Sequence, residues 1–336
     1  MVLRPNKLQF YFRAPVFTGA FLFTCCWLVG CDESSSTPDW SAGYFDAKED
    51  SGSRAVSRGV STRLAPGIRF MSYNLENWLT MERGGKQRGK PEEEKNAAVR
   101  LIVKSRPEVL GVCEIGDIND VRDLQGRLKA SGWEMKHLSY DEDSHALRRL
   151  ALLSHYPIVA TAKPKLSEYR MNGRNWRMSR PILDATVERE GCLYRFLGVH
   201  LKSKREVRDA DQNQIRINEA ILFRRHVDDI LEADPHVRLI AYGDFNDNRK
   251  STAMRKVAGQ YRTPTYLTPI PCGDSNGHRW THHWEYQDVY SRFDYVLVSQ
   301  GLKPEVDFKA SHLVDDPSWE VASDHRALLT IFRASK

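Results

Sequence analysis

The sequence predicts an α/β fold: a four-layer α/β sandwich in which two mixed, mainly antiparallel sheets pack face to face with helices outside. Three observations support this prediction. Strand and helix patterns alternate at the start of the body, strand patterns crowd together in its middle, and a long helix then leads into an apolar strand. Strand–helix–strand units favour parallel pairing and closely spaced strands favour antiparallel pairing, so both sheets are expected to be mixed.

The body begins with two strand–helix units, and apolar residues at helical spacing identify both helices. The predicted elements are residues 68–74 (strand), Glu92–Ser105 (helix), 109–113 (strand) and Ile118–Ala130 (helix). Residues 80–91 are rich in Gly, Lys and Arg, so a loop is predicted there.

The middle of the body contains strands without intervening helices. These are residues 133–138, 150–154, Ile158–Ala162, 182–188 and 194–200. The longest helical pattern follows at residues 210–233. It leads into the apolar run 239–242, which ends at Gly243 and is typical of a buried strand.

The last part of the body is less regular. Residues 251–257 are predicted to be a helix, and residues 261–279 are irregular and rich in Pro and Gly. The remaining strand predictions are residues 281–284, 293–298 and 327–332.

The first 30 residues have the order of a signal peptide, three basic residues followed by an apolar stretch. Leu28-Val29-Gly30-Cys31 resembles the lipobox of bacterial lipoproteins, which implies cleavage before Cys31 and lipidation of its thiol. An uncleaved anchor is the alternative, because about 17 apolar residues are the lower limit for spanning a bilayer. Residues 31–66 are expected to be a flexible tether and residues 67–336 a single domain. The domain is therefore expected outside the cytoplasm, on the periplasmic side or the cell surface.

Charge and cysteine content exclude some classes of protein. Three of the six net positive charges precede Cys31, which leaves the rest of the chain at +3. This charge is compatible with a phosphate-bearing substrate but does not by itself indicate nucleic-acid binding. Cys113, Cys192 and Cys272 are odd in number and widely spaced, so no disulfide framework is expected. No CxxC or HExxH spacing indicates zinc.

Polar side chains recur where predicted strands end. They are Asn74, Glu114, His200, Asp244 with Asn246, Asp294, and Asp324 with His325. One such residue is usually a turn former or a cap. Six positions of this kind favour one concave polar site.

Oxygen ligands of this kind suit a hard cation such as Mg²⁺ or Mn²⁺, and histidines beside carboxylates suit proton transfer and charge stabilisation. No GxSxG elbow or Walker loop is present. Metal-assisted attack of water on a phosphate ester is therefore the chemistry that fits best.

Six motifs occur in the order found in the endonuclease/exonuclease/phosphatase superfamily, and the chain resembles that family over residues 68–333. They are NLEN, GVCEIGD, GVHLKS, YGDFND, SRFDYVLVS and SDHRAL. The family includes pancreatic deoxyribonuclease, abasic-site endonucleases, neutral sphingomyelinases and inositol-polyphosphate 5-phosphatases.

The resemblance implies a role for each matched position. Asn74, Glu114 and Asp324 match positions at the metal or its water shell, with Glu114 the main ligand. Asp244 matches the residue that orients or deprotonates the attacking water. Asn246, His200 and His325 match groups that contact the phosphate, and His200 alternatively protonates the leaving oxygen. Asp294 matches the carboxylate that fixes the tautomer of His325.

Other residues depart from the family pattern or match it loosely. His155 replaces an arginine found in many members, and a structural role is favoured. Arg180, in the basic and aromatic stretch 172–180, aligns with a substrate-binding position that contacts phosphate, although a solvated basic loop is equally consistent. The same alternative applies to Lys202 and Lys204. The cluster His278, His282 and His283 is interpreted as a wall of the active site rather than a metal site.

These observations predict a membrane-tethered, Mg²⁺-dependent phosphodiesterase, with Mn²⁺ as a second possible cofactor. A nuclease acting on DNA or RNA is favoured over an enzyme for lipid head groups or small phosphoesters. A non-catalytic binding module is the third hypothesis. The chain is expected to act as a monomer, and its loops are expected to select the substrate.

Overall fold

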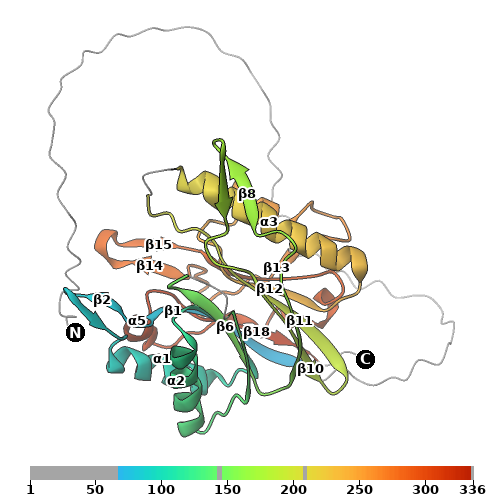
Figure 1. The fold of residues 1–336 in the computed structure, drawn as a ribbon. Helices are drawn as coiled ribbons and strands as arrows, with labels where there is room; N and C mark the ends of the chain where they lie inside the picture. Colours follow the sequence, from blue (N-terminus) through green and yellow to red (C-terminus); the bar gives the residue numbers. More distant parts are fainter. Residues whose placement is uncertain (1–66, 142–145, 207–209, 334–336) are drawn as a thin grey trace, which may run out of the picture. The chain divides into compact units, whose positions relative to one another are not determined.

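The structure is a computed structural model, and it describes residues 67–141, 146–206 and 210–333. Two six-stranded sheets dominate this part of the chain (Figure 1). The first has the order β17 (His312–Leu313), β18 (Leu328–Phe332), β1 (Ile68–Trp78), β4 (Val109–Ile115), β6 (Arg149–Ser154) and β5 (His137–Tyr140). The second has the order β13 (Thr268–Pro269), β16 (Asp294–Val298), β12 (Leu239–Asp244), β11 (Cys192–His200), β10 (Leu183–Arg189) and β7 (Ile158–Ala162).

Helices cover the outer face of each sheet. The first sheet packs against α1 (Glu92–Ser105), α2 (Ile118–Ala130) and the short α5 (Trp319–Ala322). The second packs against α3 (Gln212–Ala233) and α4 (Thr252–Ala258). Two short 3₁₀ helices, η1 (Glu285–Gln287) and η2 (Lys303–Glu305), lie in connections. The predicted fold class is therefore confirmed.

Each sheet has one parallel pair at its centre, β1 with β4 and β11 with β12, while the other pairs are antiparallel. The helices α1 and α3 lie between these parallel partners in sequence, as a crossover requires. Parallel neighbours end at the same edge of a sheet. The polar strand ends of each pair are therefore neighbours in space.

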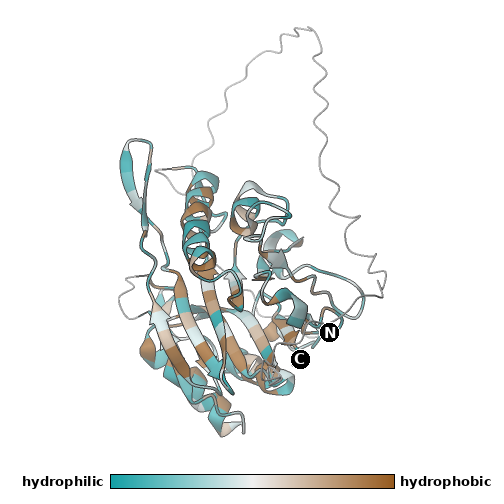
Figure 2. Ribbon diagram, turned by 90° about the vertical axis from the view of Figure 1, so that its right-hand side faces the viewer, coloured by the Kyte–Doolittle hydropathy of each residue, from teal (hydrophilic) through white to brown (hydrophobic). Residues whose placement is uncertain are grey.

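The core between the sheets is apolar and tightly packed. Phe70 contacts Phe196 and Tyr242 across it, with ring centroids 5.0 and 4.9 Å apart. Figure 2 shows apolar residues running along the strands of the sandwich. The Tyr242 ring fits only because Gly111 and Gly198 lie beside it; a Cβ at Gly111 would lie 2.1 Å from Tyr242 Cε2.

The buried hydroxyl of Tyr242 has no hydrogen-bond partner among the described residues. Tyr242→Phe is therefore expected to leave the free energy of unfolding unchanged or raise it by about 1 kcal/mol, because an unsatisfied polar group is removed. Urea denaturation of both proteins tests this. A loss above about 1 kcal/mol would mean that the hydroxyl is hydrogen-bonded in solution, for example to buried water.

Two stretches predicted as loops are partly hairpins. Residues 80–91 contain β2 (Met81–Arg83) and β3 (Lys86–Arg88), and residues 172–180 contain the second strand of the hairpin β8 (Glu168–Met171)–β9 (Arg174–Arg177). The turn residues Gly84-Gly85 and Asn172-Gly173 all have positive φ, which is how two-residue hairpin turns match strand twist. Similarly, β5 begins only at His137, so the strand predicted at residues 133–138 began too early.

A buried ion-pair network joins β10, β11 and α3. Asp184 accepts hydrogen bonds from Arg195 Nε and Nη2 at 2.9 and 2.6 Å, and from His226 Nε2 at 2.8 Å. Burial alone would raise the pKa of Asp184, but these hydrogen bonds outweigh it and hold the pKa below its ordinary value.

The network predicts a pH-dependent stability. Because the pKa of Asp184 is lower in the folded state, its stabilisation is complete above the unfolded pKa of about 3.9 and is lost as pH falls through the folded pKa. Asp184→Asn is expected to cost about 3–5 kcal/mol at pH 7 and progressively less below about pH 4. Denaturant titrations of both proteins at pH 7 and pH 3 measure this difference.

Within the described ranges, no helix is long and apolar enough to cross a membrane. The predicted signal peptide, the lipidation site Cys31 and the tether lie outside the described residues. Cys113 and Cys272 are buried free thiols, and the half-buried Cys192 packs against the core between the sheets.

Candidate active site

Glu114 lies in a β-bulge. Its neighbours Cys113 and Ile115 pair with successive residues of β6, so Glu114 is left between them without a partner in that ladder. Its φ of 60° is left-handed. Bulges of this kind redirect a side chain, and strained backbone tends to cluster at functional sites. The side chain accepts a hydrogen bond from the Asn77 backbone N–H at 3.1 Å.

The end of β1 is irregular opposite this bulge. Its register with β4 shifts between Asn74 and Trp78, and Glu76 and Asn77 have positive φ. The Asn74 side chain is held on both sides: its Oδ1 accepts from the Glu76 N–H at 3.1 Å, and its Nδ2 donates to Asp244 Oδ2 at 3.1 Å. Asn74 therefore links the two sheets at the site.

On the second sheet, His200 and Asp244 are direct neighbours across the parallel β11–β12 pair. His200 Nε2 lies 3.6 Å from Asp244 Oδ2 and 3.8 Å from Glu114 Oε1. Asn246 follows with φ of 52°; its N–H donates to Asp244 Oδ1 at 2.8 Å, and its Nδ2 donates to the Leu201 carbonyl at 3.0 Å. Phe245 is fully buried between Phe223 and Tyr295, as its position in an extended chain predicts.

Asp294 begins β16 and orients His325. Its Oδ2 accepts a hydrogen bond from His325 Nδ1 at 2.7 Å, which directs Nε2 of His325 to within 3.9 Å of Asp244 Oδ2. His325 and Asp294 are both buried.

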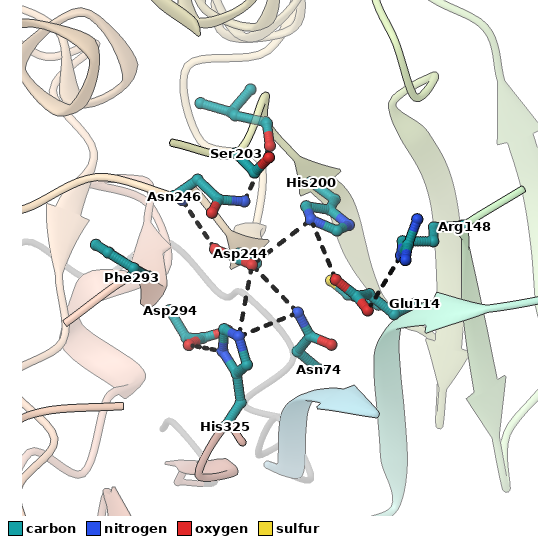
Figure 3. A network of polar contacts seen from close by, with 12 residues as sticks. Asn74, Glu114, Arg148, His200, Ser203, Asp244, Asn246, Phe293, Asp294 and His325 are labelled. Carbon is teal, nitrogen blue, oxygen red and sulfur yellow. Dashed lines mark hydrogen bonds and ion pairs between the residues drawn. The ribbon is translucent and has the colours of Figure 1, made fainter. Parts of the chain in front are cut away.

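The structure thus brings most of the predicted residues into one polar network, shown in Figure 3. Its members are Asn74, Glu114, His200, Asp244, Asn246, Asp294 and His325. Asp324 lies at its edge, with Oδ1 3.8 Å from His325 Nε2. Arg180 donates to the carbonyls of His200 and Leu201 at 3.3 and 3.4 Å, so it lies behind the histidine rather than among the carboxylates.

The two histidines have opposite electrostatic environments. Burial, reinforced by the positive charge of Arg180, holds the pKa of His200 well below its ordinary value. For His325, burial acts in the same direction but is outweighed by Asp294 and Asp324, which raise its pKa well above the ordinary value. The site therefore combines a neutral and a cationic imidazole, a pairing that suits recognition of an anion.

The carboxylates crowd one another. Burial and then the charge of Asp294 raise the pKa of Asp244 to about 7. Enclosure and then the charges of Glu76 and Glu114 raise the pKa of Asp324 to about 7, although 40% of its side chain is exposed. Such repulsion costs free energy unless a cation relieves it.

These residues fit a divalent metal ion. Glu114 and Asp324 offer carboxylate oxygens, and the Asn74 amide oxygen retains a lone pair beyond its hydrogen bond to Glu76. Oxygen donors without thiolates suit a hard cation. Ligand atoms within 4.8 Å of one another occur in two groups among the described residues: His282 with Asp324 and His325, and Asp244 with Asp294 and His325.

The structure adds residues that the sequence did not single out. Glu76 accepts the Asp324 N–H at 3.1 Å, and the buried Lys90 ammonium donates to the Glu76 carbonyl at 3.1 Å. Arg148 donates to Asn77 Oδ1 at 2.6 Å and lies 3.4 Å from Glu114 Oε2. Glu76 and Asn77 belong to the NLEN motif and could have been found there. Nothing local in sequence marks Lys90 or Arg148.

Four other histidines that the sequence singled out have either a structural environment or a position beside the network. His155 donates from Nδ1 to the Glu134 carbonyl at 2.5 Å and packs on Trp133, which is a structural environment. His278 pairs with Asp274, and His283 with Asp288. His282 alone of the three borders the network, with Nε2 3.8 Å from Asp324 Oδ2.

The network offers two imidazoles in opposite electrostatic environments, the amide of Asn246, the enclosed carboxylate of Asp244 and oxygen ligands for a metal. These are the components that hydrolysis of a phosphoester requires: a positioned water, stabilisation of developing charge and a Lewis acid.

Comparison with known proteins identifies the family and the fold of the chain. A family model described as "Endonuclease/Exonuclease/phosphatase family" matches residues 76–315. No curated protein matches the chain.

Among solved structures, truncated Caenorhabditis elegans TDP2 is similar at 14% identity and a TM-score of 0.55, over 80% of this chain and 98% of that one. The human Nocturnin catalytic domain with bound sulfate aligns at 18% identity and a TM-score of 0.55, over 81% and 96%. An endonuclease/exonuclease/phosphatase from Bacteroides vulgatus aligns at 14% identity and a TM-score of 0.57, over 80% and 99%. At these identities the likeness is one of fold.

Proposed function

The chain belongs to the endonuclease/exonuclease/phosphatase family and is a metal-dependent phosphoester hydrolase, and from this premise we propose that it is a Mg²⁺-dependent phosphodiesterase that cleaves nucleic acid. Lipid head groups and small phosphoesters are the alternative substrates.

A row of cations beside His200 carries the proposal of a nucleic-acid substrate. The chain continues from His200 directly into Lys202, Lys204 and Arg205, of which the last two are exposed. Arg180 lies behind the same segment through its hydrogen bonds to the His200 and Leu201 carbonyls. A substrate with a single phosphate group does not need cations that extend beyond the active site. Cations that continue outward from the site suit a polymer with further phosphates.

We propose one role for each residue of the network, and the contacts of the side chains support these roles. Glu114, Asn74 and Asp324 would hold Mg²⁺, which would supply Lewis-acid stabilisation of charge on the phosphate. Asp244, held by Asn74 and the Asn246 N–H, orients the attacking water and accepts its proton. Asn246, His200 and His325 contact the phosphate oxygens, and Asp294 keeps His325 Nε2 directed toward them.

A substrate panel tests the proposal. The full chain in detergent, with Mg²⁺, is assayed against single-stranded and duplex DNA, RNA, sphingomyelin vesicles and inositol phosphates. We expect cleavage of nucleic acid, abolished by EDTA and restored by Mg²⁺. Turnover of lipid or inositol phosphates without any cleavage of nucleic acid would contradict it.

Glu114→Gln is expected to weaken Mn²⁺ or Mg²⁺ binding by at least about tenfold, because the main charged ligand becomes neutral. Isothermal titration calorimetry measures this without turnover. Glu134→Gln, which alters a surface carboxylate paired with Lys129, is the control and should bind metal as the parent does. Equal affinities for all three proteins would exclude Glu114 as the main ligand.

We also propose that the lipid anchor on Cys31 keeps the enzyme outside the cytoplasm. Lipid labelling of the full chain in a bacterial host tests this. Cys31→Ser should abolish label incorporation. Retention in the membrane fraction without label would instead favour the uncleaved anchor.

A further inference from the structure

The first half of α3 carries two buried residues of opposite charge, Arg216 and Glu219, which are not members of the polar network. Arg216 is 3% exposed and Glu219 is 0% exposed. They are three residues apart, so they lie on the same side of the helix. Burial of a charge is costly unless the group is paired and hydrogen-bonded, so the partners of these side chains indicate their role.

Glu219 bridges two segments of backbone. Its Oε1 accepts a hydrogen bond from the Ser179 N–H at 3.0 Å, and its Oε2 accepts one from the Lys202 N–H at 2.6 Å. Ser179 directly precedes Arg180, and Lys202 is the second residue after His200. Glu219 therefore joins the chain before β10 to the chain after β11.

Arg216 binds the other backbone group of Lys202 and reaches a third segment. Its Nη1 donates to the Lys202 carbonyl at 3.0 Å, and its Nε donates to Asp247 Oδ2 at 3.0 Å. Asp247 is buried and follows Asn246 in the turn after β12. Figure 3 shows Ser203, the residue after Lys202, close to Asn246. One helix thus holds both backbone groups of Lys202 and the turn beside it.

The three segments include the second-sheet groups on the phosphate side of the network. They contain or adjoin Arg180, His200 and Asn246. The Leu201 carbonyl links them further, because it accepts from Asn246 Nδ2 at 3.0 Å and from Arg180 Nη1 at 3.4 Å. The register of the β11–β12 pair ends at His200 and Asp244, and charged side chains of α3 hold the chain beyond it.

The metal side of the network is held differently. Asn74 accepts from the Glu76 N–H, and Glu114 accepts from the Asn77 N–H. These contacts lie within the first sheet and do not involve α3. A change in the charged residues of α3 should therefore affect the phosphate side alone.

We propose that Arg216 and Glu219 are positioning residues for phosphoester hydrolysis, which hold His200 and Asn246 where the phosphate binds. This inference rests on the proposed roles of His200 and Asn246. It gives α3 a part in the reaction besides covering the sheet. A displacement of about 1 Å at such a site can cost about 10²-fold in rate, so loss of one contact should slow hydrolysis.

Glu219→Gln tests the proposal with little change in side-chain size. Both partners of Glu219 are N–H donors, so the amide can accept from only one of them and presents its own NH₂ group to the other. We expect kcat with Mg²⁺ to fall about 10–100-fold on single-stranded DNA and on bis-p-nitrophenyl phosphate. Isothermal titration calorimetry should give the wild-type affinity for Mg²⁺.

Hydrogen exchange measures the positioning without turnover. In the wild type the amides of Ser179 and Lys202 should exchange slowly, because both donate to a buried carboxylate. In Glu219→Gln at least one of them should exchange at least about tenfold faster, while the amides of β12 stay protected.

Two further variants of α3 serve as controls. Glu232→Gln removes the same charge at an exposed position of the helix and should match the wild type in kcat and in hydrogen exchange. Glu219→Asp keeps the charge but withdraws the carboxylate by one methylene group, so it should keep one of the two bonds and lose less kcat than Glu219→Gln. Thermal unfolding gives the temperature below which each variant is folded, and kcat is compared there. If Glu219→Gln does not fold, Glu219→Asp takes its place in the comparison.

A double variant tests whether the two residues act on the same segment. Arg216→Lys keeps the charge but offers a single ammonium group to the Lys202 carbonyl and Asp247, so it should also lower kcat. Because Arg216 and Glu219 both bind Lys202, the losses in the double variant should be smaller than the product of the single losses.

The outcomes separate this inference from the proposed function. If the wild type cleaves nucleic acid and folded Glu219→Gln retains its kcat, the positioning role is wrong while the nuclease stands. An equal loss of kcat and of Mg²⁺ affinity would also overturn the positioning role, because the effect would then extend to the metal side. If the wild type hydrolyses only lipid or inositol phosphates, the proposed substrate is wrong, and the same comparison on that substrate decides the positioning role.

Discussion

Asp244→Asn is expected to lower kcat by about 10²–10⁴-fold, the usual contribution of a general base. The substitution keeps the size of the side chain and an oxygen that can accept from the Asn246 N–H. It removes the negative charge enclosed between His200 and His325, at 3.6 and 3.9 Å from their Nε2 atoms. An amide can neither deprotonate water nor attract it as strongly as a carboxylate.

Asp184→Asn is the matched control for this prediction. Asp184 is also a buried aspartate of the second sheet, but its partners are Arg195 and His226 rather than members of the polar network at the candidate active site. Measured below the unfolding temperature of both variants, Asp184→Asn should retain the wild-type kcat. If Asp244→Asn keeps more than about a tenth of the wild-type kcat, Asp244 is not the general base.

Gly243→Ala is expected to destabilise the fold by more than about 3 kcal/mol. The φ of Gly243 is 129°, which is accessible to glycine and strained for alanine. A Cβ at this position would also lie 2.0 Å from the carbonyl oxygen of Val199 on the neighbouring strand. That oxygen belongs to the backbone of a central strand, so it cannot move without disturbing His200, the next residue.

Gly126→Ala provides a control of opposite sign. Gly126 lies on the exposed side of α2, where a Cβ meets no atom within 4 Å. Alanine there should raise the free energy of unfolding by up to about 1 kcal/mol, through its higher helix propensity. Urea denaturation measures both variants. A loss below about 1 kcal/mol for Gly243→Ala would show that the β11–β12 pair tolerates a side chain at this point.

Elements with a periodic pattern of apolar residues were predicted to within a few residues of their observed ends. Glu92–Ser105 and Ile118–Ala130 match α1 and α2 at both ends, because apolar spacing and flanking residues mark helices locally. The hairpins at Gly84-Gly85 and Asn172-Gly173 were missed. Their turn residues favour left-handed backbone, but the strands around them are exposed and lack an apolar pattern.

The sequence predicted which residues form the candidate site, but it did not predict how their side chains are arranged in space. Asn74, Glu114, His200 and Asp244 lie in the last part of their strands and Asp294 begins one. Their common location therefore follows from the strand order once two parallel pairs exist. The bulge that redirects Glu114 could not be predicted. The bulge depends on how β4 pairs with β1 on one side and with β6 on the other.

The sequence by itself determined the strand ends that carry polar side chains and the apolar run that ends at Gly243. It also determined the oxygen and imidazole groups, for which phosphoester hydrolysis is the chemistry that fits best. The tertiary structure determined the properties that depend on the distance between residues far apart in the sequence. It brought the Lys90 ammonium to the backbone carbonyl of Glu76 and gave His200 and His325 opposite electrostatic environments. Burial and charge proximity act over distances of a few ångströms, and only the folded chain establishes them.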